Sequence, residues 1–361
     1  MTKTTLNSLV VTSHNEFKTK RFFKRLDGIR GLAILAVVWH HSLGLNPSTN
    51  PIFTRGYLGV DLFFVLSGFL ITTLLLREYE RNGTISLKEF YIRRTLRIFP
   101  VYYAFLLMLL IWYGLTDKDT FNTYLEVFPY YALYLTNWLS SDTSQIFERG
   151  WSLAVEEQFY LFWPGLLLIL GAYRTKVSIT LLVMVSIILT ISMDDGAFGY
   201  WLKHFIPFRT IFVGALLAFT LHNINSFSNF FIVLTHRFTA PILIVLIILM
   251  LSMASSAING GIELVLHIMF ALLIGTIVIN ENSYTAIIIG NRLFSIIGIV
   301  SYGIYIFHGQ LQGISRYLVG FLPFNDTKVI FFTVFTVIST VVALISFYTF
   351  EQYFLKLKKK Y

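Results

Sequence analysis

The chain has 361 residues, of which 56% are apolar and only 13% are charged. Soluble domains carry roughly a quarter of their residues as charged side chains, so this composition, with a mean hydropathy of +0.69, excludes a water-soluble globule. There is no cysteine, which excludes disulfides, thiolate metal ligands and a thiol nucleophile. The formal net charge is +9, and its meaning depends on where the basic residues lie along the chain.

Apolar runs of the length that crosses a bilayer as a helix recur along the whole chain. They lie at residues 28–45, 57–76, 98–114, 151–172, 177–193, 207–221, 239–253, 262–280, 294–318 and 328–354. Another apolar run, 127–139, is only about 13 residues long, a length that favours a re-entrant or interfacial segment. We therefore predict an all-α fold, a polytopic transmembrane helical bundle of about ten spans with one short segment that does not cross.

The distribution of lysine and arginine orients this bundle, because basic residues concentrate in cytoplasmic loops. With ten spans most of the basic residues face the cytoplasm, whereas an eleventh crossing would place the LKLKKKY tail outside. We expect a basic cytoplasmic tail at 1–25, a transmembrane domain at 26–354 and a second basic cytoplasmic tail at 355–361. The first span has no small-residue cleavage site and is expected to be retained. Membrane topology thus accounts for the positive charge without a nucleic-acid partner.

Ionisable side chains in the predicted spans mark candidate site residues, because a polar group inside a bilayer is costly and faces a cavity or a partner. The first span contains Arg30, His40 and His41. Eleven helical steps from Arg30 to His41 exceed three full turns by only about 20°, so these two side chains share a face. His40 points about 80° away from Arg30 by the same geometry. The two histidines are therefore expected to serve different purposes.

Other ionisable residues enter three further spans at about the depth of His41, counting about 1.5 Å of rise per residue from the end of each span. They are Asp61, Glu156, Glu157 and His308. A common depth on spans far apart in sequence predicts a shared polar chamber in the outer half of the membrane. His267 also lies in a predicted span, but no motif surrounds it, and we interpret it as a contact between helices.

A basic amphipathic stretch, LKEFYIRRTLRIFPVYY, leads from the cytoplasm into the third span. Arg94 and Arg97 are three residues apart and share a helical face, and the planar fork of arginine binds two phosphate oxygens at once. Pro100 predicts a break or a first helical turn. The stretch is a candidate phosphate site, although such clusters also serve as topology signals or bind anionic lipid headgroups.

Five motifs, in this order, resemble those of the acyltransferase-3 family of integral membrane O-acyltransferases. They are RLDGIRGLAILAVVWHHS, GYLGVDLFFVLSGFLI, FYIRRTLRIFPVYY, WSLAVEEQFYLFWP and SYGIYIFHG, and the resemblance covers residues 25–354. The family's first motif, an Arg or Lys followed by ten residues and a His, falls on Arg30 and His41. Its Arg-x-x-Arg falls on Arg94 and Arg97. Its Trp-Ser-Leu…Glu motif falls on Trp151, Ser152, Leu153 and either Glu156 or Glu157.

The resemblance implies transfer of an acyl group, most often acetyl, from cytoplasmic acyl-CoA to a hydroxyl of a carbohydrate or lipid-linked glycan acceptor at the outer side. His41 is then the candidate general base. Asp61, one of Glu156 and Glu157, or Tyr305 would orient it or position the acceptor, and His308 is a further candidate catalytic residue without an assigned role. Those that would bind acyl-CoA are Arg30, Arg94 and Arg97, and no metal is expected.

Two further expectations follow from the resemblance. Some relatives carry an extra span and an extracytoplasmic SGNH-type domain after the core, and we expect neither in this chain. We expect an integral membrane protein of a bacterial inner or plasma membrane with both termini in the cytoplasm.

Two other classes of function stay open. Buried carboxylates and histidines also form the proton relays of secondary transporters, although the chain has no paired halves or matched Gly/Pro-broken spans of the kind that accompany inverted repeats. A non-catalytic protein that holds or flips a lipid-linked glycan would use the same residues for binding alone. Release of free CoA in the presence of acceptor separates the enzyme from both.

Overall fold

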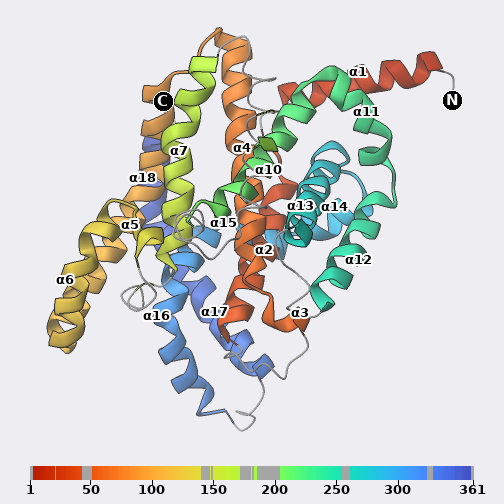
Figure 1. Ribbon diagram of the computed structural model, residues 1–361. Helices are drawn as coiled ribbons and strands as arrows, with labels where there is room; N and C mark the ends of the chain where they lie inside the picture. Colours follow the sequence, from red (N-terminus) through yellow and green to blue (C-terminus); the bar gives the residue numbers. More distant parts are fainter. Residues whose placement is uncertain are drawn as a thin grey trace. The chain divides into compact units, whose positions relative to one another are not determined.

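A computed structural model describes the greater part of the chain. The described residues are 3–20, 22–42, 51–139, 147, 149–170, 180, 183–184, 204–253, 261–322 and 328–358. Every regular element among them is a helix (Figure 1), which confirms the predicted all-α class for this part of the chain. The chain divides into two compact units, the first formed by Met1–His40, Leu45–Ile85 and Leu166–Ile299 and the second by His41–Gly44, Ser86–Gly165 and Val300–Tyr361.

Five of the described helices are long and apolar enough to cross a membrane, and the number rises to seven if each of two bent helix pairs is one span. The five are α4 (Leu58–Asn82), α5 (Leu87–Thr116), α7 (Gly150–Leu170), α13 (Gly261–Ile279) and the run Lys328–Lys358. The bent pairs are α10 (Ile206–His222) with α11 (Ile224–Thr235), and α15 (Arg292–Ile299) with α16 (Ser301–Val319). The chain is therefore a multi-pass membrane protein.

The predicted count of about ten spans is not confirmed. The predicted span 177–193 lies outside the described residues except for 180 and 183–184. Helix α2 (Arg25–Ser42) has the length of a span but starts with charged residues, and α12 (Thr239–Ser252) is shorter than the others. Helices α2 and α12 and the region 177–193 each correspond to a predicted span. None of the three is among the described helices that are long and apolar enough to cross a membrane.

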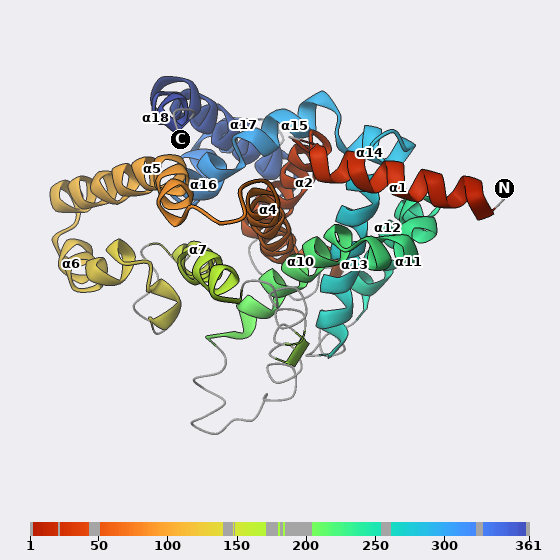
Figure 2. The ribbon, with the colours of Figure 1, turned by 90° about the horizontal axis from the view of Figure 1, so that it is seen from above.

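The first unit is assembled on α4 and α10, whose backbones touch. A Cβ added to Gly214 would lie 2.0 Å from the carbonyl oxygen of Val65, and one added to Gly68 would lie 1.9 Å from that of Ile211. Small residues permit such close helix packing where lipid supplies no hydrophobic driving force. Helix α13 packs against both helices, and α1 (Lys3–Thr19) lies against α10, α11 and α13 (Figure 2). The unit also contains α3 (Pro51–Thr54) and α14 (Tyr284–Ile289).

The second unit contains α5, α6 (Lys118–Ala132), η1 (Thr136–Trp138), most of α7, α16, α17 (Lys328–Ser346), η5 (Phe347–Glu351) and α18 (Gln352–Lys358). Helices α16 and α17 lie side by side (Figure 1), and α5 packs against both α6 and α18. The last two described residues of α2, His41 and Ser42, also belong to this unit. It therefore brings together segments from the beginning, the middle and the end of the sequence.

The break predicted at Pro100 is wrong. Helix α5 runs without interruption from Leu87 to Thr116 with the proline inside it. Neighbouring helices can offset the hydrogen bond that a proline removes from a membrane helix. The carbonyl that the missing N–H of Pro100 leaves without its helical donor is that of Leu96. The hydroxyl of Tyr302 on α16 donates to the neighbouring carbonyl oxygen of Ile98 at 2.9 Å, so α16 contacts α5 close to the proline.

The short predicted segment 127–139 is folded irregularly. Helix α6 ends at Ala132, and Tyr134 adopts a left-handed backbone with φ of 54° before the 3₁₀ turn at Thr136–Trp138. The amide of Leu135 donates to the carbonyl oxygen of Tyr130 at 2.7 Å, which closes the turn. Whether this segment lies within the membrane stays a prediction.

The close contact between α4 and α10 predicts the effect of one methyl group. Gly214→Ala would force the two backbones apart, and we expect it to lower the free energy of unfolding by about 1–3 kcal/mol. Gly313→Ala is the matched control, because a Cβ there meets nothing within 4 Å and alanine favours the helix by up to about 1 kcal/mol. Denaturation of the purified variants measures both. Equal stability of Gly214→Ala and Gly313→Ala would contradict the packing.

Candidate active site

Two histidines from opposite ends of the sequence meet in the second unit. The ring of His308, on α16, is completely buried, and its Nδ1 lies 2.8 Å from the carbonyl oxygen of Tyr305 and 3.0 Å from that of Ile304. Its Nε2 lies 3.3 Å from Nδ1 of His41. The amide of Gln312 donates to the carbonyl oxygen of His41 at 2.7 Å, which ties the last turn of α2 to α16.

These contacts assign the protons on both rings. A carbonyl oxygen only accepts hydrogen bonds, so Nδ1 of His308 carries the hydrogen and Nε2 of the neutral ring is an acceptor. The contact between the rings is then a hydrogen bond only if Nδ1 of His41 donates. In that tautomer Nε2 of His41 carries no hydrogen, so it is the nitrogen of this ring that can accept a proton.

His40 has different surroundings, as its position on the helix predicts. Its Nδ1 lies 2.9 Å from the carbonyl oxygen of Thr54, and its ring meets Tyr57 edge to face in the first unit. This nitrogen donates to a backbone acceptor. His40 is thereby engaged in holding the start of α4 close to α2.

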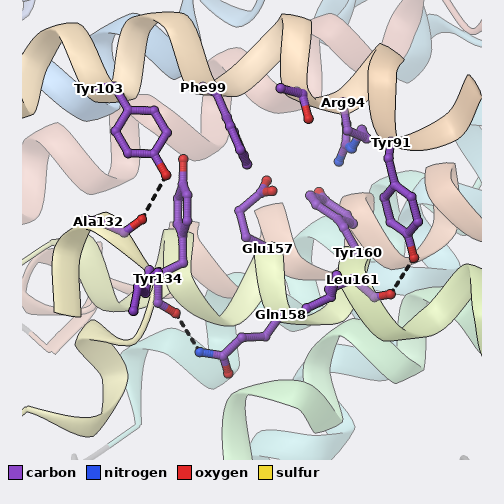
Figure 3. A pocket seen from close by; sticks show the side chains of 12 residues that line it. Tyr91, Arg94, Phe99, Tyr103, Ala132, Tyr134, Glu157, Gln158, Tyr160 and Leu161 are labelled. Carbon is purple, nitrogen blue, oxygen red and sulfur yellow. Dashed lines mark hydrogen bonds between the residues drawn. The ribbon is translucent and has the colours of Figure 1, made fainter. Parts of the chain in front are cut away.

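A pocket of about 270 Å³ lies between α5, α7 and the turn that follows α6 (Figure 3). Its lining residues are Tyr91, Arg94, Thr95, Phe99, Tyr103, Ala132, Leu133, Tyr134, Glu157, Gln158, Tyr160 and Leu161. Two tyrosines of α5 connect the elements around the pocket. The Tyr91 hydroxyl donates to the Leu161 carbonyl on α7 at 2.6 Å, and the Tyr103 hydroxyl donates to the Ala132 carbonyl on α6 at 2.8 Å. Five of the twelve lining residues are aromatic, and Arg94, Thr95, Glu157 and Gln158 add polar or charged groups, a mixture found in small-molecule sites.

The two adjacent glutamates of α7 have different environments. The carboxylate of Glu157 points into the pocket between Phe99 and Tyr160 (Figure 3). Glu156 instead accepts a hydrogen bond from the hydroxyl of Tyr160. The sequence leaves open which glutamate faces a site, and the structure places Glu157 in the lining of the pocket.

Of the two arginines in the basic stretch, Arg94 reaches the pocket. Its guanidinium carbon lies 3.7 Å from the centre of the Tyr160 ring, a cation–π contact that fixes a charge beside aromatic surface. Its Nε is buried and has no hydrogen-bond partner among the described residues. Arg97, one turn further along α5, does not line the pocket.

Tyr134 is a pocket residue that sequence reasoning missed. An aromatic residue with φ of 54° is unusual, and such backbone strain clusters at functional sites. Its ring stacks on Tyr102 with centroids 4.3 Å apart, and its carbonyl oxygen accepts from Gln158 Nε2 at 2.7 Å. Burial, and then the charges of Tyr302 and Glu157, raise the pKa of the Tyr134 phenol. The hydroxyl is therefore a neutral donor, and no described residue accepts from it.

No local signal marks Tyr134 in the sequence. Residues with a left-handed backbone are usually Gly or Asn, whereas Tyr134 lies within the aromatic and apolar run YYALYL. Its conformation depends on tertiary contacts with α5 and α7, which sequence spacing does not reveal.

Residues of the Trp-Ser-Leu motif join the start of α7 to α16. The hydroxyls of Ser152 and Tyr305 contact each other, and each oxygen lies 3.2 Å from the carbonyl oxygen of Arg149. Each hydroxyl has one hydrogen, so two of these three contacts are hydrogen bonds at any one time. The Arg149 guanidinium lies against Gly309, where an added Cβ would be 2.3 Å from Nη1. Tyr305 is also one of the two residues whose carbonyl oxygens orient His308. Ser152 therefore stabilises the helix that carries the histidine.

Arg30 and Asp61, both predicted site residues, lie in the first unit. Arg30 Nη1 is 3.2 Å from Oδ1 of Asp27. Asp61 lies with Glu263 and His267, and ligand atoms of the three are all within 4.8 Å of one another. Among the described residues, this is the one group of three side chains whose donors suit a metal ion.

Comparison with curated proteins finds relatives of one kind. A protein of Staphylococcus aureus strain COL named "Putative O-acetyltransferase" is 28% identical over 334 residues, which is 85% of this chain and 54% of the relative. A protein named "Peptidoglycan O-acetyltransferase OatA", from Listeria monocytogenes, is 35% identical over 161 residues, 42% of this chain and 25% of the relative. This chain thus matches about half the length of the first relative. No solved structure matches.

The family assignment rests on a match that covers most of the chain. A family profile described as "Acyltransferase domain" matches residues 23–349. The match includes every motif from which the sequence predicted the family. The chain belongs to the acyltransferase-3 family.

Proposed function

We propose that the chain is a membrane-embedded O-acyltransferase that moves an acyl group, acetyl in the simplest case, from acyl-CoA to a hydroxyl of a carbohydrate. Membership of the family and the names of the relatives support acyl transfer and a glycan acceptor. The observation that carries the proposal is the His41–His308 contact, in which Nδ1 of His41 donates to Nε2 of His308 and Nε2 of His41 is the nitrogen that can act as the base. The donor binds from the cytoplasm and the acceptor, free or lipid-linked, from the outer side of a bacterial plasma membrane, with both termini cytoplasmic.

The reaction needs one proton transfer in each direction. His41 Nε2 takes the proton of the acceptor hydroxyl as its oxygen attacks the thioester carbonyl, and a tetrahedral intermediate forms. Collapse of the intermediate breaks the carbon–sulfur bond, and the departing sulfur takes the proton back from His41 to give free CoA and an ester. His308 remains a hydrogen-bond acceptor for His41 Nδ1 throughout, so it stabilises the imidazolium that forms in between.

The pocket offers a binding site for part of the donor. Arg94 supplies a fixed positive charge of the kind that binds phosphate oxygens, and the aromatic walls provide apolar contact. Arg97 and Arg30 are assigned to the same donor on the strength of the family motif. Glu157 and Asp61 remain candidates for positioning the acceptor, since His308 already occupies the orienting position beside His41.

Removing the base tests the chemistry. His41→Ala should lower kcat by at least about 10²-fold, the usual contribution of general base catalysis. His236→Ala is the control, because His236 is an exposed histidine in the first unit. The measurement is the release of CoA and the appearance of acetyl ester on isolated cell-wall glycan, with purified protein in liposomes and acetyl-CoA offered on one side. Full activity of His41→Ala would overturn the assignment.

His308 is a positioning residue, and its variants should differ by their ability to accept a hydrogen bond. His308→Ala should lower kcat by at least about tenfold and leave KM for acetyl-CoA unchanged. His308→Gln, whose side-chain oxygen can accept from His41 Nδ1, should recover part of the loss. If kcat fell equally in His308→Ala and His308→Gln, the loss of activity would not come from losing the hydrogen-bond acceptor that orients His41.

Arginine variants test the donor site. Arg94→Ala and Arg97→Ala should each raise KM for acetyl-CoA about tenfold or more, because a charged hydrogen bond contributes about 1.5–3 kcal/mol. Arg93→Ala is a control from the same helix, since Arg93 is an exposed partner of Glu89 at 3.1 Å. If KM for acetyl-CoA were unchanged in both Arg94→Ala and Arg97→Ala, acetyl-CoA would not bind at these two arginines.

Tyr134→Phe should separate stability from activity. Removing a buried hydroxyl that has no acceptor should raise the free energy of unfolding by about 1 kcal/mol. If that hydroxyl binds the donor, kcat/KM should nevertheless fall about fivefold to tenfold, the effect of one lost hydrogen bond. Melting curves and initial rates measure the two effects. A variant as active as the wild type would exclude the hydroxyl from the binding site.

A further inference from the structure

Three helices of the first unit begin at a common cluster of ionisable side chains. Asp61 lies in the first turn of α4, Glu263 in the first turn of α13, and Arg209 near the start of α10. His267 follows Glu263 by four residues on α13, so the two side chains share a face of that helix. Of these side chains only that of Asp61 is also a candidate for the proposed acyl transfer.

The contacts within the cluster are close. Arg209 is completely buried, and its Nη2 lies 2.6 Å from Oε2 of Glu263. Nε2 of His267 lies 3.5 Å from Oδ2 of Asp61, and its Nδ1 lies 3.3 Å from the hydroxyl of Thr210. Ligand atoms of Asp61, Glu263 and His267 are all within 4.8 Å of one another.

One nitrogen in this cluster has no hydrogen bond. His267 is only 1% exposed, and its Nε2 is buried without a hydrogen-bond partner among the described residues, although it faces the Asp61 carboxylate. Buried polar atoms are nearly always satisfied, and an exception requires an explanation such as an ion. A buried nitrogen that faces a carboxylate at 3.5 Å without a hydrogen bond is therefore a second and independent sign of a ligand.

The charges of the cluster point to a cation. Arg209 pairs with the Glu263 carboxylate, and the Asp61 carboxylate faces Nε2 of His267. Two carboxylates at a partly buried position favour a positive counter-ion. A positive ion between the carboxylates and Nε2 of His267 would compensate their charge and would satisfy the orphan nitrogen.

We propose that Asp61, Glu263 and His267 bind a divalent transition-metal ion, of which Zn²⁺ is the representative. Zinc takes imidazole nitrogen and carboxylate oxygen at about 2.0–2.2 Å. Two donors 3.5 Å apart subtend about 113° at an ion about 2.1 Å from each, close to the tetrahedral angle. Mg²⁺ and Ca²⁺ fit less well because they prefer oxygen ligands throughout.

The surroundings suit such a site. Arg209 holds Glu263 and Thr210 holds His267, which are the outer contacts that orient metal ligands. The side chains of Asp61 and Glu263 are 17% and 25% exposed, so an ion can enter from the end where the three helices begin. Three protein donors leave a fourth position for water or another ligand. The proposal departs from the sequence-based expectation of no metal and gives Asp61 a role outside the acyl transfer.

Zinc binding by the whole purified chain tests the proposal. Protein in detergent is stripped with a chelator and dialysed against buffered ⁶⁵Zn²⁺, and one ion per chain should bind at micromolar free zinc. His267→Gln and Asp61→Asn should each raise Kd at least about tenfold, a loss at least as large as that from removing an outer contact. His236→Gln, which changes an exposed histidine of the same unit, should leave Kd unchanged.

A measurement on the wild type keeps the test decisive if a variant fails to fold. Co²⁺ bound at a site with histidine and carboxylate ligands has a visible absorption spectrum, and one equivalent of Zn²⁺ should abolish it. If the wild type retains no zinc at micromolar concentration, or if His267→Gln binds it as tightly, the proposal is wrong. The cluster would then be two ion pairs, Arg209 with Glu263 and a protonated His267 with Asp61.

Discussion

The account of this protein depends on one hydrogen bond between two imidazole rings. The tautomer of His308 is fixed, because its Nδ1 faces two carbonyl oxygens of its own helix, and a carbonyl oxygen can only accept. Its Nε2 is therefore an acceptor, and His41 must turn its Nδ1–H toward it. The proposed role of His41 Nε2 as the base that takes the proton of the acceptor hydroxyl depends on that direction. A backbone constraint on one helix thus determines the reactivity of a side chain on another.

Indirect support of this kind occurs elsewhere in the second unit as well. Ser152 and Tyr305 share the carbonyl oxygen of Arg149, and Tyr305 in turn supplies a carbonyl oxygen to His308. The Trp-Ser-Leu motif therefore contributes to the site through position, not through a nucleophilic serine. In the pocket, Gln158 donates a hydrogen bond to the carbonyl oxygen of Tyr134, which adopts the left-handed backbone. The ring of Tyr160 contacts the guanidinium of Arg94, and this neutral ring does not cancel the positive charge. Aromatic contacts here keep a charge in place without cancelling it.

The sequence predicted the features that depend on period and composition. Apolar runs predicted an all-helical membrane protein, helical spacing predicted different surroundings for His40 and His41, and the order of motifs predicted the family. It failed at two positions: α5 continues through Pro100, and Tyr134 adopts a left-handed backbone without a glycine. The choice of Glu157 over Glu156 for the pocket, and the meeting of Asp61 with Glu263 and His267, depend on helix packing that spacing does not encode.

The tautomer of His41 is the most direct test of the central claim. Nitrogen-15 NMR of the chain labelled at its 8 histidines, with the His41 signals assigned by their loss in His41→Gln, distinguishes a protonated from a bare ring nitrogen. At neutral pH the account predicts that Nδ1 of His41 carries hydrogen and that Nε2 is bare. A bare Nδ1 with a protonated Nε2 would contradict it, because the nitrogen assigned to accept the proton of the acceptor hydroxyl would already be occupied.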